Sequence, residues 1–551
     1  MPQALGRFRT LWWLPALLAI AVAYRTSTGF GLLADARFLV VENRLLDGVQ
    51  HLWGNLTHDY FWSSSGNHIP YWRPLTKASW LLEVQLWGRN PPGFHLVQLA
   101  WLLLGALGVT GLARTLGATR LWAALAGLLF GLHPAVVEPA CLVMARSDVV
   151  AATGAIWTLL AWQQWRLRGD KTWLLLHLLA LMVALGSKES SVALAPVLTL
   201  WAWWTRPTEP RLAWLRTVTP VWFLCIVYGL LRTLCLGSHA GAPLVLSPLR
   251  VLVGAGVYLQ ALWPLAFQTG VRNLTLAEAA APPTWVPALV LLMAFALLGL
   301  WLLRTRRFGA LALWLWIAAS LAPVLLVEQL NVPGVEGKFP LANRWLLQAV
   351  AATAVLLALL ASALRQPRWA HTLAGIVGLW ALATVAIAPS LHEAYASETA
   401  MLSLEDHAFL ATPERFRTLE DRCRAGTRAL LRATGSFDPF AYVPAECRNR
   451  PDDLYNLVAA LLGQHRIADA RRLLTDLLAH PPLDRRFAAP LRLMAAQIFL
   501  ESGQPQRALR LLREAERLGV RDPEVHQLLQ KLQVYMASPA GQPTPVPPSP
   551  Q

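Results

Sequence analysis

The feature that most constrains this chain is a succession of long apolar runs, each close to the length that crosses a lipid bilayer. A crossing needs about 20 residues, because a helix that rises about 1.5 Å per residue must span roughly 30 Å of hydrocarbon. In that solvent a helix satisfies its own backbone hydrogen bonds. Eleven runs are predicted to span, at about 10–27, 94–113, 119–134, 148–165, 172–187, 190–205, 213–235, 284–303, 308–327, 342–364 and 369–388.

The basic residues between these runs predict the orientation of the chain, since Lys and Arg concentrate in the short cytoplasmic loops of membrane proteins. A further apolar segment, 249–268, contains Pro264, and counting it as a crossing would place Arg304, Arg306 and Arg307 outside. We therefore predict that it is re-entrant or interfacial. The inside loops are then Arg114 to Arg120, Arg166 to Lys171, Arg206 to Arg216, Arg304 to Arg307 and Arg365 to Arg368. The segments expected outside are 28–93, 134–147, 236–283, 328–341 and everything after 389.

The sequence after about residue 390 predicts a water-soluble helical domain over 390–535, following a membrane domain over 1–389. Two stretches, His465 to Ala470 and Gly503 to Ala508, place small residues at offsets that let paired helices pack closely, as in tetratricopeptide repeats. The two stretches start 38 residues apart, whereas that repeat has a period of 34. The tail 536–551 is rich in Pro, Ser and Gln and is predicted to be disordered.

Composition agrees with a membrane protein and argues against a nucleic-acid-binding one. The chain is 55% hydrophobic and 15% charged, and its mean hydropathy is +0.42. Its net charge of +16 comes largely from arginines in the loops between apolar runs, and no basic stretch is interleaved with stacking aromatics in a soluble domain. The 26 tryptophans suit anchoring at the membrane interface.

The five cysteines are too few for a disulfide framework. Cys141, Cys225 and Cys235 lie in or beside apolar runs, where cysteine is expected to act as a packing residue. Cys423 and Cys447 lie in the polar C-terminal part, where a single disulfide is compatible with an oxidising compartment. The sequence leaves that pairing open.

Charged side chains at the predicted outer boundary are the candidates for chemistry, because charges near a membrane are costly. Asp35 follows the first span, where the simpler alternative is a solvated acid that ends a helix. Arg73 stands among aromatic residues and suits a phosphate or a sugar hydroxyl, and the alternative is an arginine that snorkels to the interface.

Three later connections add further charge at the same level. The turn 133–148 carries a histidine, an arginine and two carboxylates, which is more than helix capping requires. A neighbouring cation and anion follow the run 172–187, with a plain ion pair as the alternative, and another cation lies at the start of the run 342–364. The candidates in these connections are His133, Glu138, Arg146, Asp148, Lys188, Glu189 and Arg344.

These residue types fit the transfer of a group from an anionic lipid carrier. A carboxylate can accept the proton of an attacking hydroxyl, and cations can hold the leaving phosphate. The chain has no HExxH, no paired CxxC, no Walker loop and no GxSxG elbow, which argues against the common metalloprotease, zinc-module, nucleotide-hydrolase and esterase classes.

Taken in order, seven short motifs resemble a known family. The chain is similar to the GT-C polytopic glycosyltransferases, and within them to the transmembrane and tetratricopeptide-repeat O-mannosyltransferases and their bacterial relatives. The motifs are Asp35 with Val40-Val-Glu-Asn43, Tyr71-Trp-Arg-Pro-Leu-Thr76, Trp87-Gly-Arg-Asn-Pro-Pro-Gly-Phe-His95, Leu132-His-Pro-Ala-Val-Val-Glu138, Ala145-Arg-Ser-Asp148, Ser187-Lys-Glu189 and Asn343-Arg-Trp345. The resemblance covers about 320 residues, and the repeat-like C-terminus strengthens it.

The resemblance implies an all-α polytopic helix bundle with a large first outer loop carrying short amphipathic helices. It further implies that Asp35 is the catalytic base of an inverting transfer, with Glu138 as a second acidic residue of the site. Arg73, Lys188 and Arg344 are then the candidates for the lipid phosphate. Relatives often have a second acid near the first span and Glu-Arg-Tyr in the late motif, whereas this chain has Asp35-Ala36 and Asn343-Arg-Trp345.

By this analogy the protein is expected to be a membrane glycosyltransferase that uses a polyprenyl- or dolichyl-phosphate sugar and acts on an outside-facing hydroxyl. The helical repeats are expected to bind a protein acceptor or partner, in the periplasm of a bacterium or in the lumen of the endoplasmic reticulum. No metal ligand is assigned, and the need for a divalent metal is left open. The alternative is a non-enzymatic membrane scaffold or assembly factor that works through its repeats. The enzyme hypothesis requires Asp35, Glu138 and Arg344 to meet at the outer leaflet.

Overall fold

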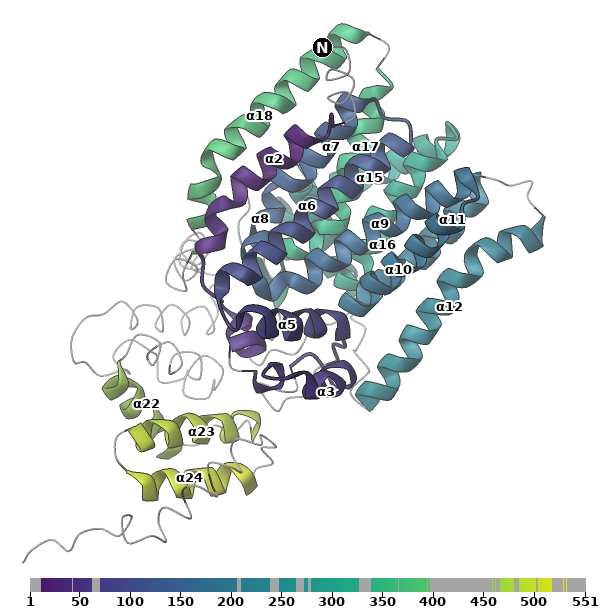
Figure 1. Ribbon diagram of the computed structural model, residues 1–551. Helices are drawn as coiled ribbons and strands as arrows, with labels where there is room; N and C mark the ends of the chain where they lie inside the picture. Colours follow the sequence, from purple (N-terminus) through teal and green to yellow (C-terminus); the bar gives the residue numbers. More distant parts are fainter. Residues whose placement is uncertain are drawn as a thin grey trace, which may run out of the picture. The chain divides into compact units, whose positions relative to one another are not determined.

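The structure is a computed structural model of the whole chain, and the fold below is drawn from its described residues (Figure 1). Clustering of contacts gives two compact units, the first of which comprises Met1–Ser64, His68–Leu330 and Gly337–Glu405. The described residues are 11–41, 43–61, 70–205, 210–237, 247–263, 272–275, 279–326, 338–364, 366–393, 395–396, 458, 461, 466–479, 485–501, 504–517, 529 and 532. The Cys423–Cys447 pairing that the sequence leaves open and the tail predicted to be disordered fall outside them.

The first unit is a bundle of helices, as an apolar chain that must satisfy its own backbone requires. Several of the helices begin with a proline, whose fixed φ suits the first helical turn and whose missing N–H would have no partner there. The long helices are α6 (Pro91–Thr115), α9 (Arg146–Arg168), α10 (Lys171–Ser187), α12 (Arg211–Leu236), α15 (Pro282–Arg304), α16 (Phe308–Leu326), α17 (Leu347–Ser362) and α18 (Pro367–Glu393). The shorter ones are α2 (Leu14–Ala23), α7 (Arg120–Leu132), α8 (Pro134–Cys141), α11 (Leu194–Thr205) and α13 (Pro248–Ala261).

The described residues contain seven helices long and apolar enough to cross a membrane, or eight if the bent pair α7 and α8 forms one span. The protein is therefore a multi-pass membrane protein, and the predicted all-α class is confirmed. Two of the predicted spans, α2 and α11, are helical at the expected positions but shorter, whereas α10 matches the predicted run 172–187. The short α11 follows the 3₁₀ helix η6 (Glu189–Ala193), because the polar Lys188-Glu189-Ser-Ser segment does not continue the α-helix.

Two local expectations were wrong in detail. Residues 134–147 were expected to form a turn, but Pro134 and the cap from His133 start α8, which bends by 58° from α7. The α-helix of the predicted span 342–364 begins late, since the 3₁₀ helix η8 (Asn343–Leu346) precedes α17. The segment predicted to be re-entrant contains α13, whose 14 residues rise only about 21 Å.

Helix α9 lies at the centre of the first unit, with 89% of its apolar window buried. It packs closely against α10 because Gly154 lacks a side chain: an added Cβ would lie 2.8 Å from the backbone nitrogen of Ala184. Helices α12, α15 and α18 are at the other extreme, with about a fifth of each window buried, and their large apolar side chains are exposed. Such surfaces match lipid rather than water.

The first outer loop has a small hydrophobic core of its own. It carries α3 (Leu52–Thr57) and α5 (Pro74–Trp87), shown beside the helix ends in Figure 1. Trp80, Leu81 and Val84 of α5 pack with Leu39 and Tyr60, and the cluster includes Phe94 at the start of α6. Part of the loop is thereby fixed to the bundle.

A fully buried arginine ties α5 to two spans. Arg146, at the start of α9, donates to both carboxylate oxygens of Glu83 in α5, to the Gln98 side chain of α6 and to the Phe94 carbonyl. Burial raises the pKa of the Glu83 carboxyl and the neighbouring Arg146 charge lowers it. The pair therefore fixes α5 against α6 and α9.

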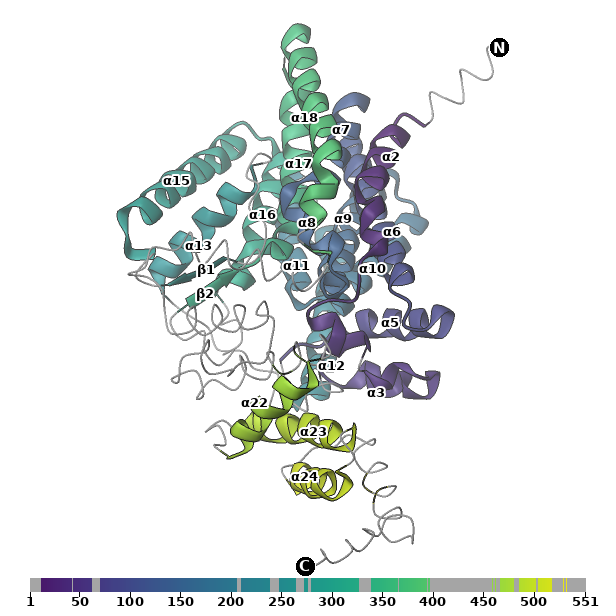
Figure 2. The same cartoon turned by 90° about the vertical axis from the view of Figure 1, so that its left-hand side faces the viewer.

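A two-stranded antiparallel ribbon, which was not predicted, joins the part of the chain between α13 and α15 to the part between α16 and α17 (Figure 2). Strand β1 (Arg272–Thr275) pairs with β2 (Lys338–Leu341), with Arg272 opposite Leu341 and Thr275 opposite Lys338. Strand β2 leads directly into η8.

The second unit holds α22 (Ile467–Ala479), α23 (Arg485–Glu501) and α24 (Pro505–Arg517). Helices α23 and α24 pack against each other, and Arg492 of α23 is 2.8 Å from Glu514 of α24. The small residues Ala470 and Ala508, singled out in the sequence, are fully buried. This is the packing of paired helices that the pattern predicts.

The buried Glu83–Arg146 pair gives a first prediction. Arg146→Met should lower the free energy of unfolding by about 3–5 kcal/mol, because it leaves Glu83 buried without its cation. The double variant Glu83→Leu with Arg146→Met should recover much of that loss. Denaturant unfolding of the detergent-solubilised protein measures both, with Arg368→Met, at an exposed arginine, as a control expected to change stability by less than about 0.5 kcal/mol. An equal loss in the single and double variants would contradict the pairing.

Candidate functional site

Seven of the nine predicted site residues belong to segments that meet at one end of the bundle. Here α9 begins and α10 ends, and both α5 and η8 contact α9. The meeting segments are the residues before η2 (Arg37–Val41), the start of α5, helix α8, the start of α9, the end of α10, η6 and η8. The predicted site residues that lie on them are Asp35, Arg73, Glu138, Asp148, Lys188, Glu189 and Arg344.

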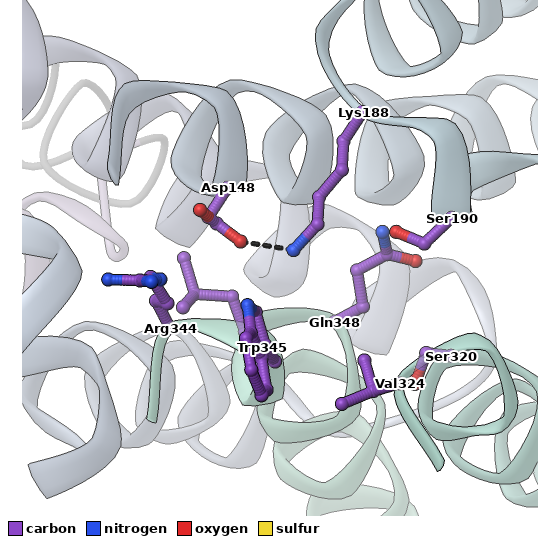
Figure 3. Close-up of a pocket in the computed structure, with 9 residues that line it drawn as sticks. Asp148, Lys188, Ser190, Ser320, Val324, Arg344, Trp345 and Gln348 are labelled. Atoms are coloured by element: carbon purple, nitrogen blue, oxygen red, sulfur yellow. Dashed lines mark hydrogen bonds and ion pairs between the residues drawn. The ribbon is translucent and has the colours of Figure 1, made fainter. Parts of the chain in front are cut away.

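Two ion pairs lie at the centre of this region. Lys188 donates to the Asp148 carboxylate, and both side chains are almost buried (Figure 3). Arg344 lies 3.4 Å from Glu138, whose side chain is 3% exposed. The second oxygen of that carboxylate, Oε2, is buried without a hydrogen-bond partner among the described residues. Buried charges are stable only when they are paired in this way.

Arg73 is held from several sides. Its guanidinium donates to Glu189 at 3.4 Å and to the Ser147 hydroxyl at 3.1 Å. It also lies over the rings of Tyr60 and Tyr71, at 4.8 Å and 4.6 Å from their centres. These cation–π contacts and hydrogen bonds fix the guanidinium in one position.

Glu189 also fixes the backbone that leads to Arg73. Its Oε1 accepts the Trp72 N–H at 2.9 Å, while the Trp72 indole donates to the Leu56 carbonyl. Tyr228 of α12 donates to the Trp72 carbonyl at 3.2 Å. The segment is thus bound to η6, to the first outer loop and to α12.

Asp35 differs from the other three acids, since its carboxylate makes no hydrogen bond or ion pair with the described part of the chain. The residue before it, Ala34, has φ +52°, a left-handed conformation that is rare for a residue with a side chain and that can mark a functional site. Burial raises the pKa of the Asp35 carboxyl, and the charges of Arg344 and Arg73 lower it. Each of the three cations therefore has its own carboxylate partner, and Asp35 is left over.

A pocket opens beside the two ion pairs (Figure 3). Its lining includes Asp148, Lys188 and Arg344, together with Ser190, Trp345 and Gln348. Asp35 is outside this lining, although it lies within electrostatic reach of Arg344. The pocket offers two cations, hydroxyl and amide groups, and one aromatic ring.

His133 and Arg146, which were also proposed as substrate-binding residues, have structural partners instead. His133 caps α8 by accepting the Ala135 N–H, and its other ring nitrogen lies 3.2 Å from the Leu262 carbonyl. Arg146 is 0% exposed and is occupied by Glu83, Gln98 and Phe94.

Sequence analysis did not single out Gln348 or Ser320, which also line the pocket. Each is a polar residue within a predicted apolar span, which was the available signal. Tyr60 and Ser147 were also missed, because an aromatic ring or a hydroxyl gains meaning only from its contact with Arg73. Among the described residues, no group of three or more His, Cys, Asp or Glu side chains is arranged to hold a metal ion.

Comparison with known proteins adds three findings. Residues 461–532 match the tetratricopeptide repeat family. Protein O-mannosyl-transferase Tmtc1 of Drosophila melanogaster is 29% identical over 175 residues, which cover 31% of this chain and 20% of that protein. Tmtc2 of the same species is 33% identical over 183 residues, and human TMTC2 is 32% identical over 136 residues, covering 19% and 15% of those proteins.

This chain resembles the tetratricopeptide-repeat O-mannosyl-transferases. The matched segments span about a fifth or less of the length of those relatives. The resemblance found in the motifs and the predicted repeat are both confirmed. A solved structure, ArnT from Cupriavidus metallidurans bound to undecaprenyl phosphate, aligns over 96% of this chain and 77% of that one at 13% identity, but with a TM-score of 0.38 the likeness is distant.

The contacts of Glu189 give a second prediction. Glu189→Ala removes the acceptor of the Trp72 N–H and the partner of Arg73, and should speed amide hydrogen exchange across residues 70–77 by about fivefold to tenfold. Exchange followed by mass spectrometry measures this. Glu189→Gln keeps an oxygen for the Trp72 N–H and should stay close to the unmodified protein at that residue. Unchanged exchange in the alanine variant would contradict the role given to Glu189.

Proposed function

We propose that the protein is a membrane glycosyltransferase that moves a sugar from a polyprenyl-phosphate donor to a hydroxyl of an outside-facing acceptor. The observation that carries the proposal is the charge arrangement of the site. Three cations are neutralised by three carboxylates, while a fourth carboxylate, Asp35, stands unpaired within reach of Arg73 and Arg344. The similarity to the O-mannosyl-transferases supports the same reaction class.

In the proposed reaction Asp35 accepts the proton of the acceptor hydroxyl as its oxygen attacks the anomeric carbon of the sugar. The bond between that carbon and the phosphate oxygen breaks on the opposite face, so the configuration inverts. The electron pair leaves with the lipid phosphate, which gains one negative charge. Lys188 and Arg344 stabilise that charge from the pocket, where a low dielectric strengthens the attraction.

The positions of the basic residues support a site on the outside of the membrane. Helix α9 carries Asp148 in its first turn and Arg166 and Arg168 in its last, and α10 returns from Lys171 to Ser187, with Lys188 at its C-terminal end. The site and the arginine-rich loops therefore lie at opposite ends of these helices, and such loops are cytoplasmic as a rule. Helix α18 starts beside Arg368 and would deliver the repeat unit to the outside, where it would bind a protein acceptor or partner.

The role of Asp35 is tested by replacing it with Asn, which keeps its shape but cannot accept the proton. Asp35→Asn should lower the rate of transfer by at least about 100-fold, with normal expression and thermal stability. Transfer of radiolabelled sugar from a polyprenyl-phosphate donor in reconstituted vesicles measures it. Asp47→Asn, at a more exposed acid of the same loop, is the matched control. Full activity in Asp35→Asn would refute the proposed base, and a scaffold working through its repeats would be indifferent to both changes.

The acidic limb of the pH profile gives a further test. A base must be ionised, so activity falls as the pH drops through the pKa of Asp35, which burial raises above its ordinary value. The charge of Arg73 lowers that pKa, so Arg73→Gln should raise it further and shift the limb by about 0.5–1 unit towards higher pH. Arg73→Lys keeps the charge and should leave the limb close to its original position. A limb that moves to lower pH in Arg73→Gln would contradict the assignment.

A further inference from the structure

The wall of the pocket that faces away from Arg344 is built by α16 and the first turn of α17. Trp316, Ser320 and Val324 are spaced four residues apart, so they share one face of α16, and Ser320 and Val324 line the pocket. Gln348 lies opposite them at the start of α17. In Figure 3 the amide of Gln348 lies beside the hydroxyl of Ser190, on the side of the pocket away from Arg344.

Gln348 is held in one orientation by a neighbour. The indole Nε1–H of Trp316 donates to Gln348 Oε1 at 3.1 Å, and both side chains are buried. An indole nitrogen donates and cannot accept, so the oxygen of the amide must be the atom that faces it. The NH₂ group of Gln348 is therefore directed away from Trp316, and no described residue accepts a hydrogen bond from it.

The rest of this wall suits an uncharged, hydroxyl-bearing ring. Trp345 offers a half-buried aromatic face, and Ser190 offers a hydroxyl that makes no hydrogen bond within the described residues. The carboxylate of the pocket, Asp148, is already neutralised by Lys188. An amide NH₂ is a donor, so it matches the oxygen of a hydroxyl and would oppose an ammonium group.

We propose that this wall is the sugar subsite of the transferase, and that Gln348 donates a hydrogen bond to a hydroxyl oxygen of the sugar while Trp345 contacts its ring. Trp316 is a positioning residue that acts through Gln348. Lys188 and Arg344 then hold the phosphate of the same donor. The inference rests on the proposed function, since it divides one pocket between the two parts of the donor.

The division is tested by comparing two lipids that differ only in the sugar. Binding of undecaprenyl phosphate and of undecaprenyl phosphate mannose is measured on the full-length protein in nanodiscs. Gln348→Met keeps the size of the side chain but lacks the donor, and should weaken binding of the mannosyl lipid about 3- to 10-fold while changing the bare lipid less than about twofold. Lys188→Met should weaken both lipids to a similar extent.

Two further variants test whether Trp316 acts by orienting the Gln348 amide. Trp316→Phe frees the Gln348 amide to rotate and should weaken the mannosyl lipid alone, by less than Gln348→Met does. Gln348→Glu keeps the acceptor for Trp316 but replaces the donor by an acceptor, and should weaken the mannosyl lipid at least as much as Gln348→Met. Thr353→Val, farther along α17 at a hydroxyl with no partner among the described residues, is the matched control and should change neither affinity.

The outcomes distinguish this inference from the proposed function. Equal weakening of both lipids by Gln348→Met, weakening of the bare lipid alone, or no change in either would overturn the sugar subsite. Transfer that still depends on Asp35 would leave the proposed function standing in those cases. An unmodified protein that binds neither lipid would overturn both.

Discussion

Charge neutralisation in an apolar surrounding is the constraint on which this structure depends. Separating a charge from water costs several kcal/mol unless a partner is close, and four cations of the first unit are each paired with a carboxylate. Arg146 takes Glu83, Lys188 takes Asp148, Arg344 takes Glu138 and Arg73 takes Glu189. These pairs join segments that are far apart in the chain, and they hold the ends of the helices in register around the pocket.

The four ion pairs differ in their access to solvent and to the pocket. The Glu83–Arg146 pair is sealed from solvent and fixes the outer helix α5, whereas Arg344 and Lys188 remain accessible from a pocket. Arg73 caps the start of α5, so the sealed pair indirectly sets the place of that guanidinium and of the field it exerts on Asp35. The pairs therefore differ in whether their cation can be reached from the pocket.

The sequence predicted the fold class and most of the helix positions because both follow from local chemistry. Apolar length predicts a span and basic loops predict its direction, so α6, α9 and α12 lie close to where they were expected. Helix ends were predicted less well, because polar residues at η6 and η8 form 3₁₀ turns where a continuous α-helix was expected. The β1–β2 ribbon joins segments more than 60 residues apart and has no local signature.

For the site, the motifs predicted which charged residues gather but not what each one contacts. Seven of nine candidates meet in one region, whereas His133 and Arg146 are occupied by backbone and by Glu83. Whether the hydrogen-bond donors of an arginine already have partners depends on its neighbours in three dimensions. The spacing of residues in the sequence does not reveal those neighbours. Gln348 shows the reverse case, because a lone amide in an apolar run gains its meaning from the indole of Trp316.

The antiparallel ribbon limits how this protein can change over evolutionary time. Strand β2 ends at Leu341, and Arg344 follows within one turn of η8. A one-residue insertion within β2 would shift its register against β1 and so move η8, with Arg344, relative to the strand that anchors it. Natural variation in length should therefore be rare within the two paired strands.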